Sequence, residues 1–170
     1  MKDIVMFEGD KFELGFGEIK YYRDLNIVKA TSSEEKNRNI VSDKKIDVVC
    51  GFEEQDRKDS LHSRNSGLNQ VILNLAHKNQ VAIGFNFNTL LGCRDNFERA
   101  LLMGRMKQNV RFCRKYKVKI VVASFAKNKY EMRDARDLLA FARALGMTGK
   151  EATEALNFEK KETGISLVKT

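Results

Sequence analysis

The sequence contains no proline, and it has only two histidines and three cysteines in 170 residues. Without proline, helix ends and turns have to be formed by Gly, Asn and Asp. Cys50, Cys93 and Cys113 lie far apart and make no CxxC pair, which argues against a zinc site built from thiolates. We therefore expect three reduced, buried thiols.

The chain also lacks the sequence patterns of common catalytic sites. His62 and His77 have no HxH, HExxH or Asp/His cluster around them, so a metallohydrolase would have to take its metal ligands almost entirely from carboxylates. His77 lies near the end of a helix expected over residues 69–78, where it would interact with the helix dipole. Asp134 and Asp137 have the spacing of an acid/base pair, but helix capping and ion pairing with neighbouring arginines is the simpler interpretation.

Motifs for cofactors and nucleophiles are missing as well. Gly15 and Gly17 lack the third glycine of a dinucleotide-binding loop, and no GxxxxGK[ST] phosphate loop occurs. Neither Ser66 nor Ser124 stands in a GxSxG motif. The sequence therefore predicts no catalytic residue, no metal ligand and no bound cofactor.

No apolar run approaches the roughly 20 residues that a membrane-spanning helix needs. Asp3, Glu8 and Asp10 interrupt the apolar residues at the N-terminus. We expect a cytoplasmic protein with no membrane contact.

Positive charge is abundant and strongly localised. The chain has 31 Lys and Arg against 23 Asp and Glu, a net charge of +8 and a pI near 9.4, so an acidic polymer is the first partner to consider. Between Leu101 and Arg136, eleven basic residues face only Glu131 and Asp134, which gives this stretch a charge of +9 and leaves about −1 for the rest. The basic excess therefore belongs to one part of the chain.

Short apolar runs rich in β-branched residues alternate with helical patterns. Such alternation predicts an α/β fold in which a parallel sheet is covered by helices. We expect one domain, because no repeat or low-complexity linker interrupts the chain. The expected strands are residues 4–7, 27–30, 46–50, 81–87 and 118–124.

Three helices have recognisable ends. One begins at Asp95, and its buried face is expected to be Leu102, Met106, Val110 and Cys113. A second ends at Gly146, and a third begins at Thr148 with Glu151 three residues later, which is a capping box. The remainder of the first 45 residues and the segment 53–66 show no clear period and are predicted as loops. Residues 159–170 form a charged tail in which a short strand at 165–168 is allowed.

Four basic residues of the helix that begins at Asp95 project from one side, beside its apolar face: Lys107, Arg111, Arg114 and Lys115. Such a row is either a solvated helix face or a phosphate-binding ridge. Acidic residues at i+4 are nearly absent, so repulsion between the cations would go uncompensated on a solvated face. This favours phosphate binding, with affinity that depends steeply on salt and weakly on nucleic-acid sequence.

An ordered set of short sequences resembles the archaeal ribonuclease P protein component 3 family, which is homologous to the thirty-kilodalton subunit of the eukaryotic enzyme. The resemblance covers roughly residues 34–157, whereas residues 1–33 match poorly and Ala135 stands where members usually have proline. The matching sequences are NR at 37–38, IDVV at 46–49, SGLNQV at 66–71, VAIGF at 81–85, FERA at 97–100, RKYKV at 114–118, RDL at 136–138 and GM at 146–147.

The resemblance implies an incomplete TIM-like β/α barrel over residues 1–158, related to metal-dependent phosphoesterase barrels but without their metal ligands. It further implies that an RNA subunit performs the Mg²⁺-dependent removal of the 5′ leader from precursor tRNA. This chain would bind that RNA and ribonuclease P protein component 2, with two copies of each protein forming a heterotetramer, and would contact precursor tRNA only indirectly.

Carried across by position, the residues expected to bind RNA are Arg38, Arg64, Arg105, Arg111, Lys115, Lys127, Arg133 and Arg136. Arginine suits this role because its planar guanidinium binds two phosphate oxygens at once. Two alternatives stay open: a barrel phosphoesterase with a carboxylate metal site, and a general nucleic-acid-binding module.

Overall fold

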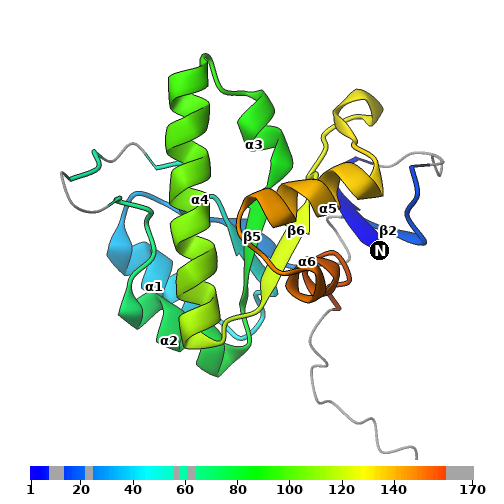
Figure 1. The fold of residues 1–170 in the computed structure, drawn as a ribbon. Coiled ribbons are helices and arrows are strands. Elements are labelled where there is room, and N and C mark those ends of the chain that lie inside the picture. The colour runs from blue at the N-terminus through cyan, green and yellow to red at the C-terminus, as the bar shows by residue number, and fades with distance from the viewer. Residues whose placement is uncertain (8–13, 22–24, 56–57, 61–63, 160–170) are drawn as a thin grey trace, which may run out of the picture.

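The structure is a computed structural model that describes the chain except for residues 8–13, 22–24, 56–57, 61–63 and 160–170 (Figure 1). Four parallel strands form one sheet in the order β3 (Ile27–Lys29), β4 (Val48–Cys50), β5 (Ala82–Asn86) and β6 (Ile120–Ala123). A second sheet pairs β1 (Lys2–Val5) with β2 (Glu18–Tyr21), again in parallel.

Strand β1 lies beside β6, so the two sheets continue into each other. The backbone N–H of Phe125 donates to the carbonyl of Ile4 at 2.9 Å, and that of Met6 donates to the carbonyl of Ala126 at 2.7 Å. The buried Asp3 carboxylate adds two bonds across the same junction, because it accepts the backbone N–H of Ser124 at 2.7 Å and the Ser124 hydroxyl at 2.6 Å.

The two faces of the sheet bury different residues. Val48 and Val121 point to an inner core, whereas their neighbours Val49 and Val122 point to an outer core beneath the helices. This alternation is that of a barrel wall. The inner core consists of Ile4, Leu25, Ile27, Val48, Ala82, Val121, Ala123 and Phe125. The predicted α/β fold with parallel strands and outer helices is thus confirmed; within the described residues, no pairing joins β2 to β3 to close the barrel.

The helices lie outside this wall. In Figure 1, α1 (Glu34–Ser42), α2 (Gln70–Asn79) and α4 (Asn96–Tyr116) stand side by side, while α5 (Ala135–Ala144) and α6 (Gly149–Ala155) lie beside β6. Two short elements follow strand ends: α3 (Phe87–Leu91) and the 3₁₀ helix η2 (Lys129–Glu131). No described helix is both long and apolar enough to cross a bilayer.

The helix ends predicted from capping residues are confirmed. The Asp95 carboxylate accepts the backbone N–H of Glu98 at 2.7 Å, and the expected apolar face of α4 is buried. Thr148 and Glu151 form the reciprocal capping box at the start of α6. Gly146 follows α5 with φ +92°.

The prediction of loops in the first 45 residues was wrong for β2 and α1. Helix α1 buries only Asn37 and Val41, so its sequence carries no apolar period. Polar contacts fix the start of this helix instead. The Ser33 hydroxyl accepts the backbone N–H of Lys36, and the side-chain amide of Asn37 donates to the Thr31 carbonyl at 2.8 Å. Residues 165–168, where a strand was allowed, lie outside the described residues. The cysteines are free, but only Cys113 is fully buried.

Candidate nucleic-acid interface and the pocket at the strand ends

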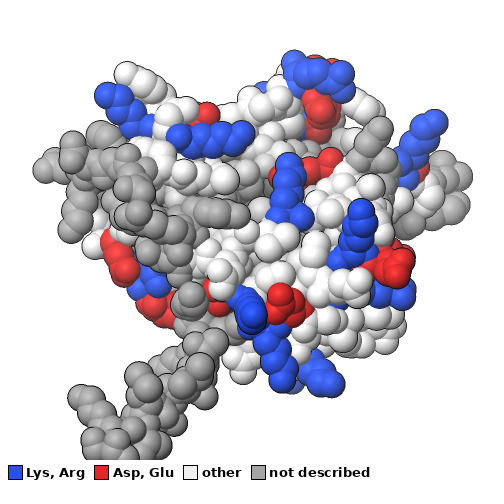
Figure 2. Space-filling view, turned by 180° about the vertical axis from the view of Figure 1, so that it is seen from behind, with Lys and Arg blue, Asp and Glu red and all other residues white. Residues whose placement is uncertain are grey.

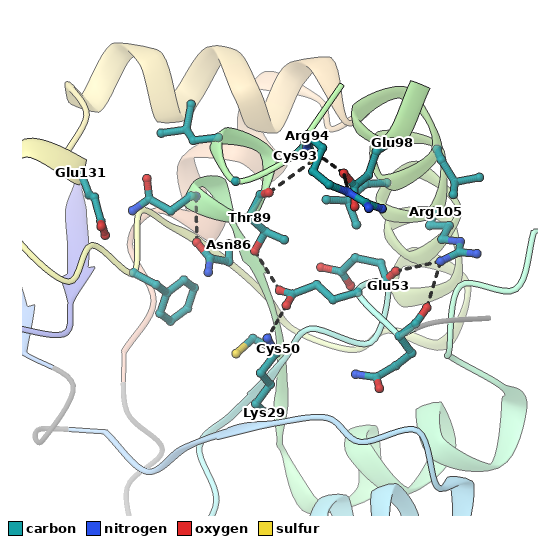
Figure 3. A pocket seen from close by; sticks show the side chains of 18 of the residues that line it. Lys29, Cys50, Glu53, Asn86, Thr89, Cys93, Arg94, Glu98, Arg105 and Glu131 are labelled. Atoms are coloured by element: carbon teal, nitrogen blue, oxygen red, sulfur yellow. Dashed lines mark hydrogen bonds and ion pairs between the residues drawn. The ribbon is translucent and has the colours of Figure 1, made fainter. Parts of the chain in front are cut away.

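A pocket of about 1240 Å³ opens at the carboxyl ends of the strands (Figure 3). Lys29 ends β3, Cys50 ends β4, Asn86 ends β5 and Lys127 follows β6, and all four line it. In barrels of parallel strands, ligand sites gather at this end, because the loops that follow the strands meet there. The pocket is therefore where the rival phosphoesterase would need its active site.

Glu53 is the most deeply buried carboxyl group of the pocket. Burial raises its pKa to about 8, so the group is mainly protonated at neutral pH. Among the described residues, its Oε2 receives one long bond, 3.5 Å from the amide nitrogen of Asn109, and its Oε1 has no hydrogen-bond partner. A neutral carboxylic acid is a poor ligand for a divalent cation.

The other carboxylates of the pocket already have partners within the chain. Glu54 forms an ion pair with Lys29 at 2.5 Å and accepts the Thr89 hydroxyl at 2.8 Å. Glu98 accepts the backbone N–H of Arg94 at 2.8 Å, and Glu131 accepts that of Lys127 at 2.8 Å. Among the described residues, no three His, Cys, Asp or Glu side chains are grouped as metal ligands. Glu54, Glu98 and Glu131 therefore stabilise the protein's own structure through these contacts.

Arg105, one of the eight residues expected to bind RNA, lies inside the protein. Its side chain is 6% exposed and forms an ion pair with Asp59 at 2.9 Å. Its guanidinium also donates to the backbone carbonyls of Glu53 at 3.2 Å and Gln55 at 3.1 Å. Arg105 therefore anchors the loop after β4 to α4, and this burial corrects the expectation that it lies on an RNA-binding surface.

The outer side of α4 carries a row of exposed cations, as the sequence predicted. Lys107, Arg111 and Lys115 follow one another at four-residue spacing and are exposed. Arg64 reaches this row from the preceding loop, because its guanidinium lies over Gly104, one turn before Lys107. We call Arg64, Lys107, Arg111 and Lys115 the α4 basic ridge. Within the described residues, none of the four forms an ion pair.

Arg114 is not part of this row, although its spacing suggested that it was. Its guanidinium donates to both carboxylate oxygens of Glu151 at 2.7 and 2.9 Å and to the Gly146 carbonyl at 2.9 Å. The hydrogen bond from Arg114, with a further one from the backbone of Thr148, lowers the pKa of Glu151 to about 2. Arg114 thus fastens α4 to α6, and the expectation that it belongs to the ridge was wrong.

The remaining predicted residues lie in two other places. Arg38 is exposed on α1 and pairs with Glu34 one turn earlier. Lys127, Arg133 and Arg136 lie near the carboxyl end of β6. Lys127 and Arg136 are exposed, whereas Arg133 is half-buried, with its Nη1 donating to the Met132 carbonyl at 2.7 Å and its guanidinium 5.8 Å from the Phe87 ring centre. The structure therefore separates the predicted set into the ridge, Arg38 and a group at the strand ends.

Two of the catalytic candidates lie at helix ends, as expected from the sequence. The Nδ1 of His77, in the last turn of α2, bonds the Lys117 carbonyl at 2.8 Å. Asp134 caps α5 by accepting the backbone N–H of Arg136 at 2.7 Å. His62 lies outside the described residues.

The general class of this protein is a basic, barrel-like α/β protein, in which parallel strands form the wall and the longest outer helix carries a row of exposed cations. The family model for RNase P subunit p30 matches residues 13–162, so the chain belongs to that family, and the resemblance in its sequence is confirmed.

The similar proteins are archaeal. Ribonuclease P protein component 3 of Methanosarcina mazei is 32% identical over 146 residues, which are 86% of this chain and 57% of the relative. The Methanocaldococcus jannaschii protein of the same name is 36% identical over 85 residues, 50% of this chain and 36% of its own. The chain spans about half the length of the first of these relatives.

A chain in the cryo-EM structure of archaeal Ribonuclease P with mature tRNA has a similar fold. The TM-score is 0.70 at 21% sequence identity, and the match covers 92% of this chain and 87% of that chain.

Proposed function

We propose that this chain is an RNA-binding subunit of ribonuclease P, which supports the RNA-catalysed, Mg²⁺-dependent removal of the 5′ leader from precursor tRNA. The observation that carries the proposal is the α4 basic ridge on a member of the RNase P subunit p30 family. Four exposed cations without carboxylate partners in the described chain favour a polyanion, because each one that meets a phosphate releases a counterion. The partners proposed with it are the RNase P RNA and protein component 2, in a heterotetramer.

Reconstitution tests this proposal directly. Precursor tRNA cleavage is measured with the cognate RNA and component 2, in the presence and absence of this chain. We expect the chain to increase cleavage at limiting Mg²⁺, since protein cations replace part of the counterion requirement of the RNA. Cleavage that is the same with and without the chain would count against it.

The ridge is tested by single substitutions. We expect Arg111→Ala or Lys115→Ala to weaken binding to the RNase P RNA and to reduce the slope of log K against log salt by about one for each phosphate contact that is lost. Lys150→Ala is the control, because Lys150 is exposed on α6 and its charge is paired with Glu154. An unchanged slope for both ridge variants would show that these side chains do not contact phosphates.

The phosphoesterase alternative predicts that purified protein retains a stoichiometric transition metal. The commitment of Glu54, Glu98 and Glu131 to contacts within the chain argues against it.

A general nucleic-acid-binding module predicts no preference for one RNA. Pull-down of one abundant structured RNA together with a small protein would separate the proposed function from that module.

A further inference from the structure

The end of the barrel opposite the pocket carries a separate group of lysines. They are Lys44 and Lys45 before β4, Lys78 at the end of α2, and Lys117 and Lys119 between α4 and β6. All five are exposed, and in the described part of the chain none of them forms an ion pair. We call them the amino-end lysine cluster. None of them is among the eight residues expected from the family resemblance.

Hydrogen bonds hold the segments that carry these lysines together. The end of α2 is tied to α1 and to the segment after α4, and the start of β5 is tied to the start of β6. The bonds run from the Asn79 amide to the Val41 carbonyl at 2.9 Å, from His77 Nδ1 to the Lys117 carbonyl at 2.8 Å, and from the Ile83 N–H to the Lys119 carbonyl at 2.9 Å. Figure 2 shows Lys and Arg side chains gathered at the lower edge of the back face, the end at which α2 and α4 finish in Figure 1.

Compensation of helix dipoles does not account for the whole cluster. Lys78 in the last turn of α2 and Lys117 at the end of α4 are placed to stabilise the partial negative charge of helix C-termini. Lys44, Lys45 and Lys119 lie outside any helix. Lys117 also has φ +56°, a conformation in which glycine is preferred, so a charged side chain occupies a position that the backbone alone would give to another residue.

Acidic residues do little to neutralise this group. Asp43, the acidic residue next to Lys44, accepts the backbone N–H of Lys45 at 2.8 Å, and its single charge leaves the five lysines in clear excess. The large exposed apolar residues of the described chain include Phe97 and Tyr130, neither of which lies in the segments of the cluster. Bases of single-stranded RNA bind by stacking on exposed aromatic rings. The described rings beside the cluster are already engaged, because Tyr116 is half-buried with the Lys115 ammonium 5.5 Å from its ring centre and His77 bonds the Lys117 carbonyl, so contact with phosphates is favoured here.

We propose that the amino-end lysine cluster is a second RNA-binding surface, which contacts the phosphates of a double-stranded RNA segment without reading its bases. Lysine provides a point charge on a flexible stem, which suits contact with phosphates rather than the paired geometry of base recognition. The proposal rests on the proposed function, in which the partner is RNA. Lys115, in the last turn of α4, lies two residues from Lys117, so the α4 basic ridge ends next to the cluster.

Binding to a short A-form RNA duplex, measured by fluorescence anisotropy over a range of salt concentrations, tests the inference. The cluster variant is Lys117→Gln with Lys119→Gln. Glutamine is tolerated in the conformation of Lys117, because Gln80 has the same φ of 56° at the end of α2. The control variant, Lys36→Gln with Lys150→Gln, removes the same charge from exposed lysines elsewhere. Thermal unfolding checks that both variants are folded.

We expect the cluster variant to bind the duplex several-fold more weakly than the control variant. The slope of log K against log salt should become smaller by about two, because each of the two lost phosphate contacts contributes about 0.9. Equal binding by the cluster and control variants overturns the inference. The ridge variant Arg111→Ala is measured alongside, so that loss of binding in that variant alone refutes the second surface and leaves the proposed function standing. Loss of poly-glutamate binding without any change in duplex binding would assign the cluster to an acidic protein, and would also overturn the inference.

Discussion

At the scale of single residues, burial decides what two ionisable side chains do. Glu53 and Arg105 belong to the same region between the loop after β4 and α4, and the Arg105 guanidinium donates to the backbone carbonyl of Glu53. The Arg105 guanidinium forms an ion pair with Asp59. In the described part of the chain, Glu53 has no cationic partner at its carboxyl group, and burial favours its protonated form.

Glu53→Gln is expected to make the protein more stable at alkaline pH. The pKa of Glu53 is about 8 in the folded state against 4.5 for an ordinary glutamate, so between these values the folded state binds the extra proton and stability falls as pH rises, by about 1.4 kcal/mol per pH unit at most. Below pH 4.5 the effect is absent. Urea unfolding from pH 5 to pH 8 should show a flatter pH dependence for Glu53→Gln than for wild type.

The control for this experiment is Glu35→Gln, at an exposed position of α1. It should leave the pH dependence of stability unchanged. Parallel pH profiles for wild type and Glu53→Gln would show that Glu53 does not hold a proton in the folded state.

Arg105→Ala is expected to destabilise the fold by about 3–5 kcal/mol, because it leaves Asp59 without its buried partner. Chemical unfolding measures this loss, and Arg111→Ala on the exposed side of α4 should change stability by less than about 0.5 kcal/mol. Arg105→Ala should therefore lower stability, whereas Arg111→Ala should weaken RNA binding and leave stability nearly unchanged. A wild-type unfolding curve for Arg105→Ala would return this residue to the group of RNA-binding candidates.

At the scale of elements, local signals predicted α2, α4, α5 and α6 but missed α1. The starts of α2, α4 and α6 follow from a capping side chain and a few nearby residues, so the sequence alone places them. Contacts between distant segments left no such signal. The Arg114–Glu151 and Arg105–Asp59 pairs join residues 37 and 46 positions apart. For that reason, spacing along the helix assigned Arg114 to the row of cations, and the family resemblance placed Arg105 among the RNA-binding residues.

In the loop between β4 and α2, Gly67 makes a close backbone contact with Phe52. A Cβ on Gly67, which has φ +83°, would overlap the backbone carbonyl of Phe52, whereas a Cβ on Gly146 at φ +92° would meet nothing within 4 Å. Both substitutions to alanine carry the conformational cost of the left-handed region, about 1–2 kcal/mol. We expect Gly67→Ala to cost clearly more than Gly146→Ala in chemical unfolding, by about 2 kcal/mol or more, because backbone atoms have to move.

Similar stabilities of the two glycine variants would mean that this loop shifts without cost. In that case the contact between Gly67 and Phe52 would not fix the path of the loop.

At the scale of the whole molecule, the structure separates three surfaces that the sequence presented as one basic stretch. The strand ends form a pocket whose charges are largely paired, the outer side of α4 carries the ridge, and the opposite end carries the lysine cluster. The net charge of +8 predicted an acidic partner but not this division, because residues such as Lys44 and Lys119 come together only when β4, β5 and β6 are aligned.

The purified chain, freed of RNA, is expected not to cleave precursor tRNA even with Mg²⁺, because the carboxylates of its pocket have partners of their own. The measurement is a cleavage assay after nuclease treatment and repurification of the protein. Cleavage that survives removal of RNA would place a catalytic site in this chain and would revive the phosphoesterase alternative.

The packing of the inner core limits which substitutions this sequence can accept. A Cβ on Gly84 of β5 would lie 2.9 Å from a methyl group of Val48 and 3.4 Å from the ring of Phe125, so the phenyl ring occupies space that the glycine leaves open. A larger residue at position 84 is tolerated only when position 125 or 48 becomes smaller. Among related chains, these positions should therefore vary together and conserve their summed volume.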